Sequence, residues 1–450
     1  MYFIYSVLLS IAFLILLPRF LFDALRHGKY VAGFRQRLGN VNPSSHSDTP
    51  IIWIHAVSVG EAQAARPLVR ELRTRFPDIA LAISTTTRTG QELAREIFRD
   101  DAVNIFYFPF DWSWTVRRVL KAIRPSAVVI METELWPAFL KECGDQRIPV
   151  AIVNGRLSEQ SFRRYRLVRS FISRVLESVA MAIMQTQDDA NRLIELGIAS
   201  TKVKVSGSLK FDAGALSAST SGSEYFKQRF GFDTTPVILA ASTHAPEERI
   251  ILDSFQQIRK TTEARLVFAP RHPERFNEVA SLLSESGLSY SRRSSPAAAS
   301  DATNSVILLD SIGELQSVYP LATLVFVGGS LAKTGGHNIL EPAAVGACVV
   351  TGAHTHNFHA IVKTFLNADA VVQLPPMPEA ESRQELTKVF SNLLADPKRR
   401  AEIGARAKQL VNENRGATQR TVDWLEPLLS SSPASTTEVS ALRVQNASTL

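Results

Sequence analysis

The sequence predicts two consecutive doubly wound (Rossmann-like) α/β domains that face each other across a cleft, preceded by an N-terminal membrane-anchor helix. From residue 51 onward, short apolar runs alternate with amphipathic stretches. This alternation stops at residues 211–223 (FDAGALSASTSGS) and resumes at residue 237. The first 17 residues carry no charge. Strands that alternate with helices form parallel sheets with crossover helices, so each run of alternation predicts one domain.

The expected strands of the first domain are short and mostly apolar, and helical stretches such as 61–76 and 136–143 lie between them. These strands are 51–54, 80–84, 104–108, 127–131, 150–153, 181–185 and 203–206. The expected strands of the second domain are 237–241, 265–269, 305–309, 323–327, 348–351 and 370–373. Residues 292–304 (RRSSPAAASDATN) are expected to form a surface loop.

Four segments follow from this pattern. Residues 1–22 are the expected anchor, 46–212 the first domain and 213–428 the second. Residues 429–450 are rich in Ser, Thr and Ala and lack the pattern of a core, which is typical of a disordered tail.

The apolar N-terminus predicts attachment to a membrane. Residues 1–17 come close to the ~20 apolar residues that span a bilayer, and they lack the basic start and cleavage site of a signal peptide. The basic residues that follow place the body on the cytoplasmic side; they are Arg19, Arg26, Lys29, Arg35 and Arg37. A helix that lies in the membrane interface is the alternative.

Composition limits the partners and the compartment. The chain has 450 residues and a formal net charge of +7, which suits an anionic substrate or a membrane surface. Its two cysteines, Cys143 and Cys348, cannot build a disulfide framework, so a reduced cytoplasmic body is expected. Neither a zinc finger nor an aromatic RNA-binding signature is present, and we expect no nucleic-acid partner.

A carboxylate marks the start of the first long helix. Glu61 follows Ser58-Val59-Gly60, directly after the apolar run 51–54. An acid in the first turn of a helix is stabilised by the helix dipole, which would be a purely structural role. Alternatively, Glu61 faces the crevice at the carboxyl ends of the strands, where open α/β folds bind ligands.

Further charged residues follow strands of the first domain. Glu132 and Glu134 in METELWP follow the expected strand 127–131. Two acids that end a buried strand are costly unless they are paired or belong to a site, so at least one is expected to be functional. Lys210 in GSLKFD follows the last strand and could stabilise negative charge at the same edge.

The second domain has its own candidate residues. Arg271 in APRHPERF follows the expected strand 265–269 and can bind a phosphate. The glycines of GGSLAKTGGHNILEP permit close approach of the backbone, and a helix that begins near Asn338 would offer free amides to a phosphate. Glu341 lies in the first turn of that helix and could accept hydrogen bonds from a ribose.

Several motifs are missing from the sequence. It lacks an Asp-x-Asp pair, a P-loop and a GxGxxG after the first strand, which argues against a metal-diphosphate site, an ATPase and a dehydrogenase. His354, His356 and His359 in GAHTHNFHA have no obvious carboxylate partner. We therefore expect neither a metal nor a cofactor.

Taken together, the motifs resemble one family. SVGE, METELWP, NGRLS, GSLKFD, STHAPEE, PRHPERF and VGGSLAKTGGHNILEPAA occur in the order and spacing of the 3-deoxy-D-manno-octulosonic acid (Kdo) transferases. The resemblance extends from the N-terminus to about residue 428. It implies a two-domain glycosyltransferase of the GT-B type, with the acceptor in the N-terminal half and CMP-Kdo in the C-terminal half.

The resemblance also implies roles for individual residues. Glu61 matches the general base of the family, and Glu132 and Lys210 match its transition-state stabilisers. The residues that match its sugar-nucleotide contacts are Pro270, Arg271, Ile312, Gly313, Glu314, Asn338, Ile339, Leu340 and Glu341.

The implied reaction is transfer of Kdo from CMP-Kdo to a tetraacyl lipid A precursor (lipid IVA), with inversion, in lipopolysaccharide core biosynthesis at the inner membrane. We expect the helix dipole to keep Glu61 ionised, as a base requires. The arginines of SFRRYRLVRS could meet phosphates of the glycolipid, although a solvated helix face explains them equally well; they are Arg163, Arg164, Arg166 and Arg169.

Two alternatives remain open at this point. One is another membrane-anchored GT-B glycosyltransferase that uses a UDP-sugar. The other is a non-catalytic protein that binds a glycolipid or a nucleotide.

Overall fold

The structure is a computed structural model that describes residues 1–27, 33–43, 49–213, 220–232 and 235–430. Its contacts divide the chain into two compact units. The first combines Met1–Ala213 with the chain from Arg415 onward, and the second is Gly214–Asn414.

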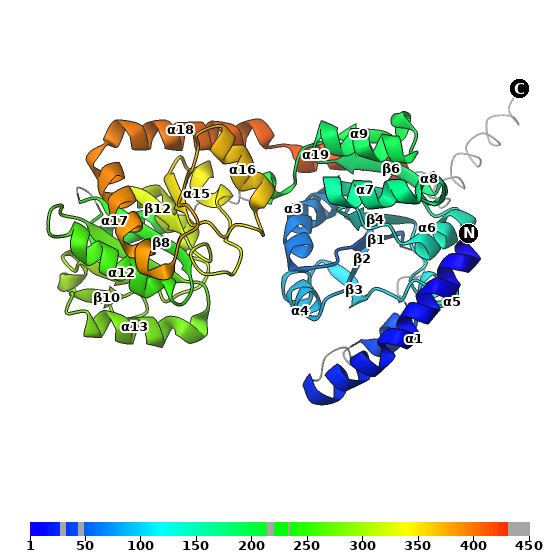
Figure 1. Cartoon of the computed structure of the whole chain (residues 1–450), viewed down its shortest axis with the longest axis horizontal. Helices are drawn as coiled ribbons and strands as arrows, with labels where there is room; N and C mark the ends of the chain where they lie inside the picture. The colour runs from blue at the N-terminus through cyan, green and yellow to red at the C-terminus, as the bar shows by residue number, and fades with distance from the viewer. Residues whose placement is uncertain (28–32, 44–48, 214–219, 233–234, 431–450) are drawn as a thin grey trace, which may run out of the picture. The chain divides into compact units, whose positions relative to one another are not determined.

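The first unit is built on a seven-stranded sheet in which all neighbouring strands are parallel (Figure 1). The strand order is β3-β2-β1-β4-β5-β6-β7, so the direction of winding reverses between β1 and β4. The carboxyl ends of strands at such a reversal are where doubly wound folds bind ligands. The strands are β1 Ile51–His55, β2 Ala80–Thr85, β3 Ala102–Tyr107, β4 Ala127–Met131, β5 Val150–Gly155, β6 Val179–Met184 and β7 Val203–Val205.

Helices cover both faces of this sheet because successive strand residues point to opposite sides. In β1, Trp53 packs into one core and its neighbours Ile52 and Ile54 pack into the other. The Trp53 face is covered by α5 Ser113–Ile123, α6 Pro137–Asp145, α8 Arg169–Glu177 and α9 Gln187–Leu196. The opposite face is covered by α3 Val59–Arg75, α4 Arg88–Ile97 and α19 Ala417–Ser430.

The N-terminal helix α1 Tyr2–His27 lies against α6 of the first unit (Figure 1). The Tyr5 hydroxyl donates to Oδ2 of Asp111 over 2.8 Å, and Nε1 of Trp112 donates to Oγ of Ser10 over 3.1 Å. The other face of the helix is apolar and exposed, at Phe3, Ile4, Val7, Leu8, Ile11, Leu14, Ile15 and Leu16. The remaining helices of this unit are α2 Phe34–Arg37, α7 Glu159–Leu167, η1 Ser200–Lys202 and α10 Lys210–Ala213.

In the described part of the chain, no helix has both the length and the hydropathy required to cross a bilayer. The spanning anchor expected at residues 1–22 is therefore not supported by the structure.

The second unit repeats the architecture with a second parallel seven-stranded sheet, in the order β10-β11-β9-β8-β12-β13-β14. The prediction of two parallel-sheet α/β domains is thus confirmed. The strands are β8 Val237–Thr243, β9 Arg265–Pro270, β10 Tyr290–Arg292, β11 Val306–Leu308, β12 Leu324–Val327, β13 Cys348–Thr351 and β14 Val372–Gln373. The helices are α11 Thr220–Phe230, α12 Glu247–Ile258, η2 Pro273–Arg275, α13 Phe276–Glu285, η3 Ala299–Ala302, α14 Leu315–Val318, η4 Tyr319–Leu321, α15 Leu340–Ala344, α16 His359–Asn367, α17 Glu379–Ala395 and α18 Pro397–Asn414.

Residues 292–304, expected to be a surface loop, are more ordered than that. They begin at the end of the edge strand β10 and include the short helix η3. The buried Asp301 of η3 accepts hydrogen bonds from Nε of Arg229 (2.8 Å) and from the hydroxyl of Ser291 (2.7 Å). This buried ion pair ties the insert to α11, an interaction that the polar sequence of the insert does not indicate.

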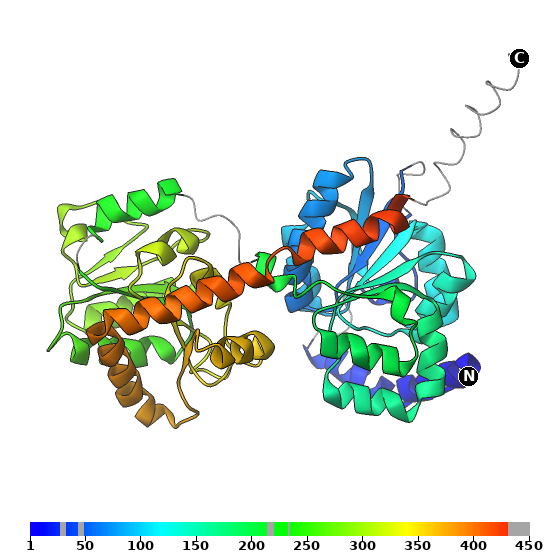
Figure 2. The same cartoon turned by 90° about the horizontal axis from the view of Figure 1, so that it is seen from above.

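The last helix, α19, packs against α3 and α10 of the first unit, and Figure 2 shows it (red) alongside that unit. The Asp212 carboxylate accepts the backbone N–H of Gly416 (2.8 Å) and of Thr418 (2.6 Å) at the start of α19. Nη2 of Arg420 donates to the carbonyl oxygen of Ser206 over 2.6 Å. The Asp212 carboxylate and the Arg420 side chain therefore hold α19 to the segment that follows β7.

Replacing Asp212 by alanine should loosen α19 and destabilise the first unit. Two backbone amides would lose their charged acceptor, so we expect a loss of about 1–3 kcal/mol in the free energy of unfolding. All five tryptophans lie in this unit, so urea unfolding followed by tryptophan fluorescence reports on it. Asp423→Ala removes an exposed ion pair of α19 with Arg75 and should cost clearly less. Equal losses in the two variants would contradict the anchoring role of Asp212.

Candidate active site

Glu61 is the third residue of α3, and its carboxylate is turned back toward the segment between β1 and the helix. Oε2 accepts the backbone N–H of Val57 over 2.8 Å, and Oε1 accepts the Ser58 hydroxyl over 3.1 Å. Only 7% of the residue is exposed. These bonds fix the position of the carboxylate at the carboxyl end of β1.

The environment of Glu61 favours its neutral form. Burial raises the pKa of Glu61 to about 8, and the neighbouring charges of Glu132 and Glu134 add to the increase, while the bonds from Val57 and Ser58 oppose it. A helix dipole contributes about 0.3–1 kcal/mol, less than the roughly 1.4 kcal/mol that corresponds to one pKa unit. The expectation that the dipole keeps Glu61 ionised is therefore wrong for the ligand-free protein at neutral pH.

Glu132 occupies a strained backbone position directly after β4. Its φ is 56°, in the left-handed region that non-glycine residues rarely adopt, and its N–H donates to the carbonyl oxygen of Val153 over 2.9 Å. Strained residues of this kind concentrate at functional sites. Oε1 of Glu132 lies 3.8 Å from Nζ of Lys210, and both side chains are partly exposed. At this distance and exposure the ion pair is weak, which leaves the ammonium group free to meet a substrate anion.

Asn154 places Lys210, and sequence reasoning assigned it no role. Asn154 is the next-to-last residue of β5 and has a φ of 56°, and its Oδ1 accepts the N–H of Leu209 over 3.1 Å. This bond ties the loop after β7 to the end of β5, one residue before Lys210. The sequence signal that could have identified Asn154 is its position in the NGRLS motif, at the end of a strand.

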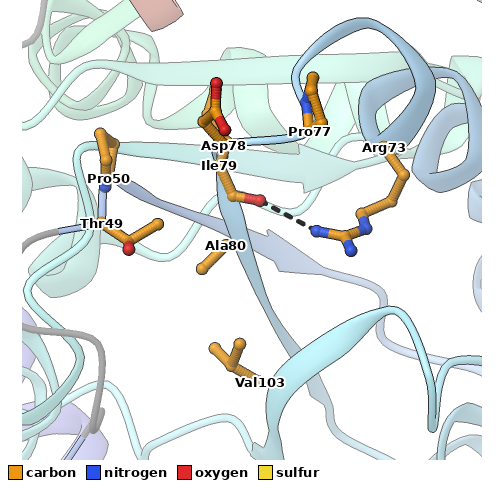
Figure 3. Close-up of a pocket in the computed structure, with 8 residues that line it drawn as sticks. All are labelled: Thr49, Pro50, Arg73, Pro77, Asp78, Ile79, Ala80 and Val103. Atoms are coloured by element: carbon orange, nitrogen blue, oxygen red, sulfur yellow. Dashed lines mark hydrogen bonds between the residues drawn. The ribbon is translucent and has the colours of Figure 1, made fainter.

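The first unit thus brings three expected residues to one edge of its sheet: Glu61, Glu132 and Lys210. A different hollow of about 540 Å³ lies where β1 and β2 begin (Figure 3). Nη1 of Arg73 donates to the carbonyl oxygen of Ile79 there, over 3.2 Å. Its lining is Thr49, Pro50, Arg73, Pro77, Asp78, Ile79, Ala80 and Val103. Because it is at the amino ends of the strands, it is not part of the candidate site.

In the second unit a buried carboxylate organises the glycine-rich loop after β12. Glu247, at the start of α12, is fully buried. It accepts the backbone N–H groups of His244 (3.1 Å), Gly329 (2.8 Å), Ser330 (2.9 Å), Leu331 (2.8 Å) and Ala332 (3.1 Å). A Cβ atom at Gly328 would lie 2.8 Å from Oε2 of Glu247, so this close approach requires glycine. The four amides of residues 329–332, in the loop after β12, therefore bind a carboxylate of the protein itself.

The expected phosphate-binding helix begins at Leu340 and is only five residues long. Oδ1 of Asn338 accepts the N–H of Leu340 over 3.0 Å, and Nδ2 of Asn338 donates to Oε1 of Glu341 over 3.1 Å. The side chains of Ile339 and Leu340 are buried. The Leu340 amide is therefore not free, and Ile339 and Leu340 can reach a ligand only through their backbone.

Arg271 and two histidines meet at the carboxyl edge of the second sheet. Pro270 is buried at the end of β9, and the exposed Arg271 donates its N–H to the carbonyl oxygen of Thr243 over 3.1 Å. Nε2 of His244 lies 2.7 Å from Nε2 of His337. The pKa of His244 is lowered to about 4 and that of His337 to about 3, mainly by burial and in part by the charge of Arg271. Neither histidine was singled out by sequence reasoning, although His244 directly follows β8 and His337 lies in the glycine-rich stretch after β12.

The expected stretch Ile312, Gly313 and Glu314 shows different contacts. Ile312 is 79% exposed, and Gly313 has a φ of 85°. The Glu314 carboxylate accepts Nη2 of Arg293 over 2.7 Å and the Ser311 hydroxyl. These contacts do not link the stretch to Arg271. In the described ranges no three His, Cys, Asp or Glu side chains gather as a metal site.

Known proteins resemble this chain over most of its length. Residues 32–213 match the family described as 3-deoxy-D-manno-octulosonic-acid transferase (kdotransferase). The 3-deoxy-D-manno-octulosonic acid transferase of Haemophilus influenzae is 34% identical over 407 residues, which cover 90% of this chain and 93% of the relative. The protein of the same name from Bordetella pertussis is 32% identical and covers 84% of this chain and 87% of its own.

Solved structures show the same two-unit fold. The UDP-GlcNAc 2-epimerase of Neisseria meningitidis matches with a TM-score of 0.54 at 17% identity, over 84% of this chain and all of its own. MurG of Acinetobacter baumannii matches with a TM-score of 0.53 at 12% identity, over 84% of this chain and 99% of its own. At these identities the likeness concerns the fold alone. The sequence relatives go further: the chain belongs to the 3-deoxy-D-manno-octulosonic acid (Kdo) transferase family.

Proposed function

We propose that this protein transfers Kdo from CMP-Kdo to a tetraacyl lipid A precursor (lipid IVA), with inversion, in lipopolysaccharide core biosynthesis. Membership of the Kdo transferase family supports the transfer of Kdo. The observation that carries the mechanism is the group formed by Glu61, Glu132 and Lys210 at the carboxyl edge of the first sheet. The donor, the acceptor and the stereochemistry are the finer parts of the proposal.

Glu61 is the proposed general base. A sugar hydroxyl is a poor nucleophile, so its proton must be removed as the new bond forms. The hydroxyl oxygen attacks the anomeric carbon of Kdo from the face opposite CMP. The bond between that carbon and the phosphate oxygen breaks, CMP leaves with the electron pair, and the proton moves to Glu61. Because burial raises the pKa of Glu61 to about 8, its ionised form is a stronger base than an ordinary carboxylate.

Glu132 and Lys210 are the proposed transition-state stabilisers. The sugar ring gains positive charge as CMP departs, and the Glu132 carboxylate can stabilise that charge. The leaving phosphate gains negative charge, which the Lys210 ammonium can stabilise. Their 3.8 Å separation supports a shared role for the two side chains.

The second unit is the proposed donor-binding part. Arg271 is exposed at the carboxyl edge of the sheet, where it can bind the phosphate of CMP-Kdo. We also assign Pro270, Asn338 and Glu341 to this site, together with the backbone of Ile339 and Leu340. We include Ile312, Gly313 and Glu314 in the proposed donor site because they match the sugar-nucleotide contacts of the family motif.

We further propose that the protein acts at the cytoplasmic face of the inner membrane and that α1 binds the membrane surface. One face of α1 is docked through Tyr5 and Ser10, and the other is an exposed apolar stripe. Exposed apolar patches of this kind are typical of membrane-binding surfaces. The acceptor glycolipid would be drawn from that surface.

Mass analysis of the product tests the proposed reaction. Purified protein is incubated with lipid IVA and CMP-Kdo, and we expect the acceptor mass to increase by whole Kdo units. Matched incubations with UDP-sugars should give no product. Transfer from a UDP-sugar, or no turnover with any donor, would overturn the proposal in favour of another glycosyltransferase or a binding protein.

Glu61→Gln should reduce kcat/KM for Kdo transfer by about a hundredfold to ten-thousandfold, the usual contribution of a general base. Glutamine can still accept the Val57 amide, so the fold and CMP binding should be preserved. Glu71→Gln, on the same helix and paired only with Arg75, is the matched control and should keep normal activity. Near-normal turnover of Glu61→Gln would eliminate the general-base role.

The pH dependence of Kdo transfer should report the ionisation of Glu61. Only ionised Glu61 can take the proton, so kcat/KM for the acceptor, measured at saturating CMP-Kdo, should rise with pH and level off above about 8. Glu132→Gln removes a charge that raises the pKa of Glu61, so the rise should move to lower pH even though the maximal rate falls. Glu134→Gln should move it less, since its effect on Glu61 is smaller. An unmoved profile in Glu132→Gln would rule out this coupling.

Replacing exposed apolar residues of α1 should release the protein from membranes. Leu8→Glu combined with Ile15→Glu changes the exposed stripe and leaves the docked face intact. Burial of such side chains is worth about 1.5–3 kcal/mol each, so partitioning onto anionic vesicles should fall at least tenfold in a sedimentation assay. Leu366→Glu, an exposed apolar residue of α16, should have no effect. Unchanged sedimentation of the double variant at high salt would place the membrane contact elsewhere.

A further inference from the structure

His244 and His337 form a hydrogen-bonded pair of imidazoles. Their Nε2 atoms lie 2.7 Å apart, and their rings are nearly parallel, at 6°. In a neutral pair only one of these nitrogens carries the shared hydrogen. The ring that donates it keeps a bare Nδ1, which is an open position for one further proton. The pair can therefore take up a proton without breaking its own hydrogen bond.

The two rings come from separate segments that end at the same edge of the second sheet. His244 directly follows β8, and His337 closes the glycine-rich loop after β12. The ring of His272, which follows β9, lies 5.1 Å from that of His244. Strands β9, β8 and β12 are neighbours in the sheet, so the three histidines sit at the carboxyl ends of adjacent strands, where open α/β sheets bind ligands.

Positive charge surrounds the pair. Arg271 and His272 lower the pKa of both histidines, and Arg275 also lowers that of His244. The acidic side chains near Arg271, His272 and Arg275 either have other hydrogen-bond or ion-pair partners or are exposed to solvent. Glu247 binds five backbone amides, Glu248 pairs with Arg275 at 2.7 Å, and the exposed Glu274 lies 3.8 Å from His272. Two further titratable groups lie near the segment that carries His337. The His356 ring lies next to Gly335, and Glu341 accepts a hydrogen bond from Asn338.

We propose that the His244–His337 pair binds the phosphate of the nucleotide and takes up a proton when that phosphate arrives. This inference rests on the proposed binding of CMP-Kdo by the second unit. Burial and the neighbouring positive groups favour the neutral form of both rings, and a bound phosphate would reverse this field, since an adjacent anion favours the charged imidazole. The proton comes from solvent and returns to it when CMP leaves.

The charged pair would also serve the transfer step. As the bond between sugar and phosphate oxygen breaks, the phosphate gains one negative charge. An imidazolium already in place beside Arg271 stabilises that charge without further reorganisation. The two histidines thereby add the second positive charge that a phosphate dianion requires.

The proton uptake gives CMP binding a defined pH dependence. A proton is taken up at any pH between the pKa of the free pair and its higher pKa in the complex. Affinity is therefore highest at low pH and falls as the pH rises through the pKa of the complex, by up to about tenfold per pH unit for one full proton.

Calorimetry of CMP binding to the full chain in detergent tests the proposal. Titrations at pH 7.5 in PIPES and in Tris, without inorganic phosphate, give the number of protons exchanged from the difference in enthalpy. A phosphate monoester with a pKa near 6 is already mostly a dianion at this pH, so uptake belongs to the protein. We expect uptake of at least about 0.3 proton per CMP at pH 7.5 and, correspondingly, at least about a twofold weaker Kd at pH 8.5 than at pH 7.

Variants assign the proton to its site. His244→Gln and His337→Gln should each remove the uptake and flatten the pH dependence of Kd. His359→Gln, an exposed histidine of α16, is the matched control and should retain both. Circular dichroism shows whether each variant is folded, and if one of the two pair variants is not, the other still assigns the proton.

The outcomes separate the two proposals. CMP binding by the wild type without proton uptake overturns the role of the pair and leaves the proposed function intact. Uptake that persists in both pair variants and disappears in His272→Gln also overturns it, and assigns the proton to His272. A failure of CMP to bind at any pH from 5.5 to 8.5 overturns the proposed donor and this inference together.

Discussion

The candidate donor site depends on the carboxylate of Glu247. A fully buried carboxylate costs several kcal/mol unless hydrogen bonds compensate it, and five backbone amides supply that compensation at 2.8–3.1 Å. Charge-assisted bonds of this kind contribute about 1.5–3 kcal/mol each. Because the amides belong to the turn after β8 and to the loop after β12, one side chain fixes two segments that are more than eighty residues apart. The hydrogen bond between His244 and His337 follows from that arrangement.

Glu61 occupies the equivalent topological place in the first unit. Both glutamates lie in the first turn of the helix that follows the first strand of a doubly wound sheet, α3 after β1 and α12 after β8. Their environments differ in the number of donors. Glu247 accepts five amides, whereas Glu61 accepts one amide and one hydroxyl and lies near the charge of Glu132. Burial raises the pKa of both carboxyl groups, but Glu247 is fixed by more hydrogen bonds than Glu61.

The sequence predicts much of this fold because its buried parallel strands are continuous apolar runs bounded by turn residues. It misses β10, since Tyr-Ser-Arg at a sheet edge has no apolar run. Strand-end reasoning finds Glu61, Glu132, Lys210 and Arg271, because parallel strands deliver their following residues to one edge. It does not reveal that Asn154 holds Leu209 or that Glu247 holds the loop after β12, because hydrogen bonds between distant segments leave no periodic signal. The expectation that Glu61 is ionised is wrong because burial and two nearby acids raise its pKa by more than a helix dipole can lower it.

The raised pKa of Glu61 has a cost in stability. In the unfolded chain this carboxyl has its ordinary pKa of about 4.5, and in the folded protein its pKa is about 8. Between these values the unfolded state binds fewer protons, so the stability of the first unit falls as the pH rises. The contribution is fully present below about pH 4.5 and is lost as the pH passes through about 8. The ionised form of Glu61, which the proposed role as general base requires, is thus the form that destabilises the fold. Contacts that do not involve the Glu61 carboxylate add stability to the same unit, among them the two backbone amides that Asp212 accepts at the start of α19.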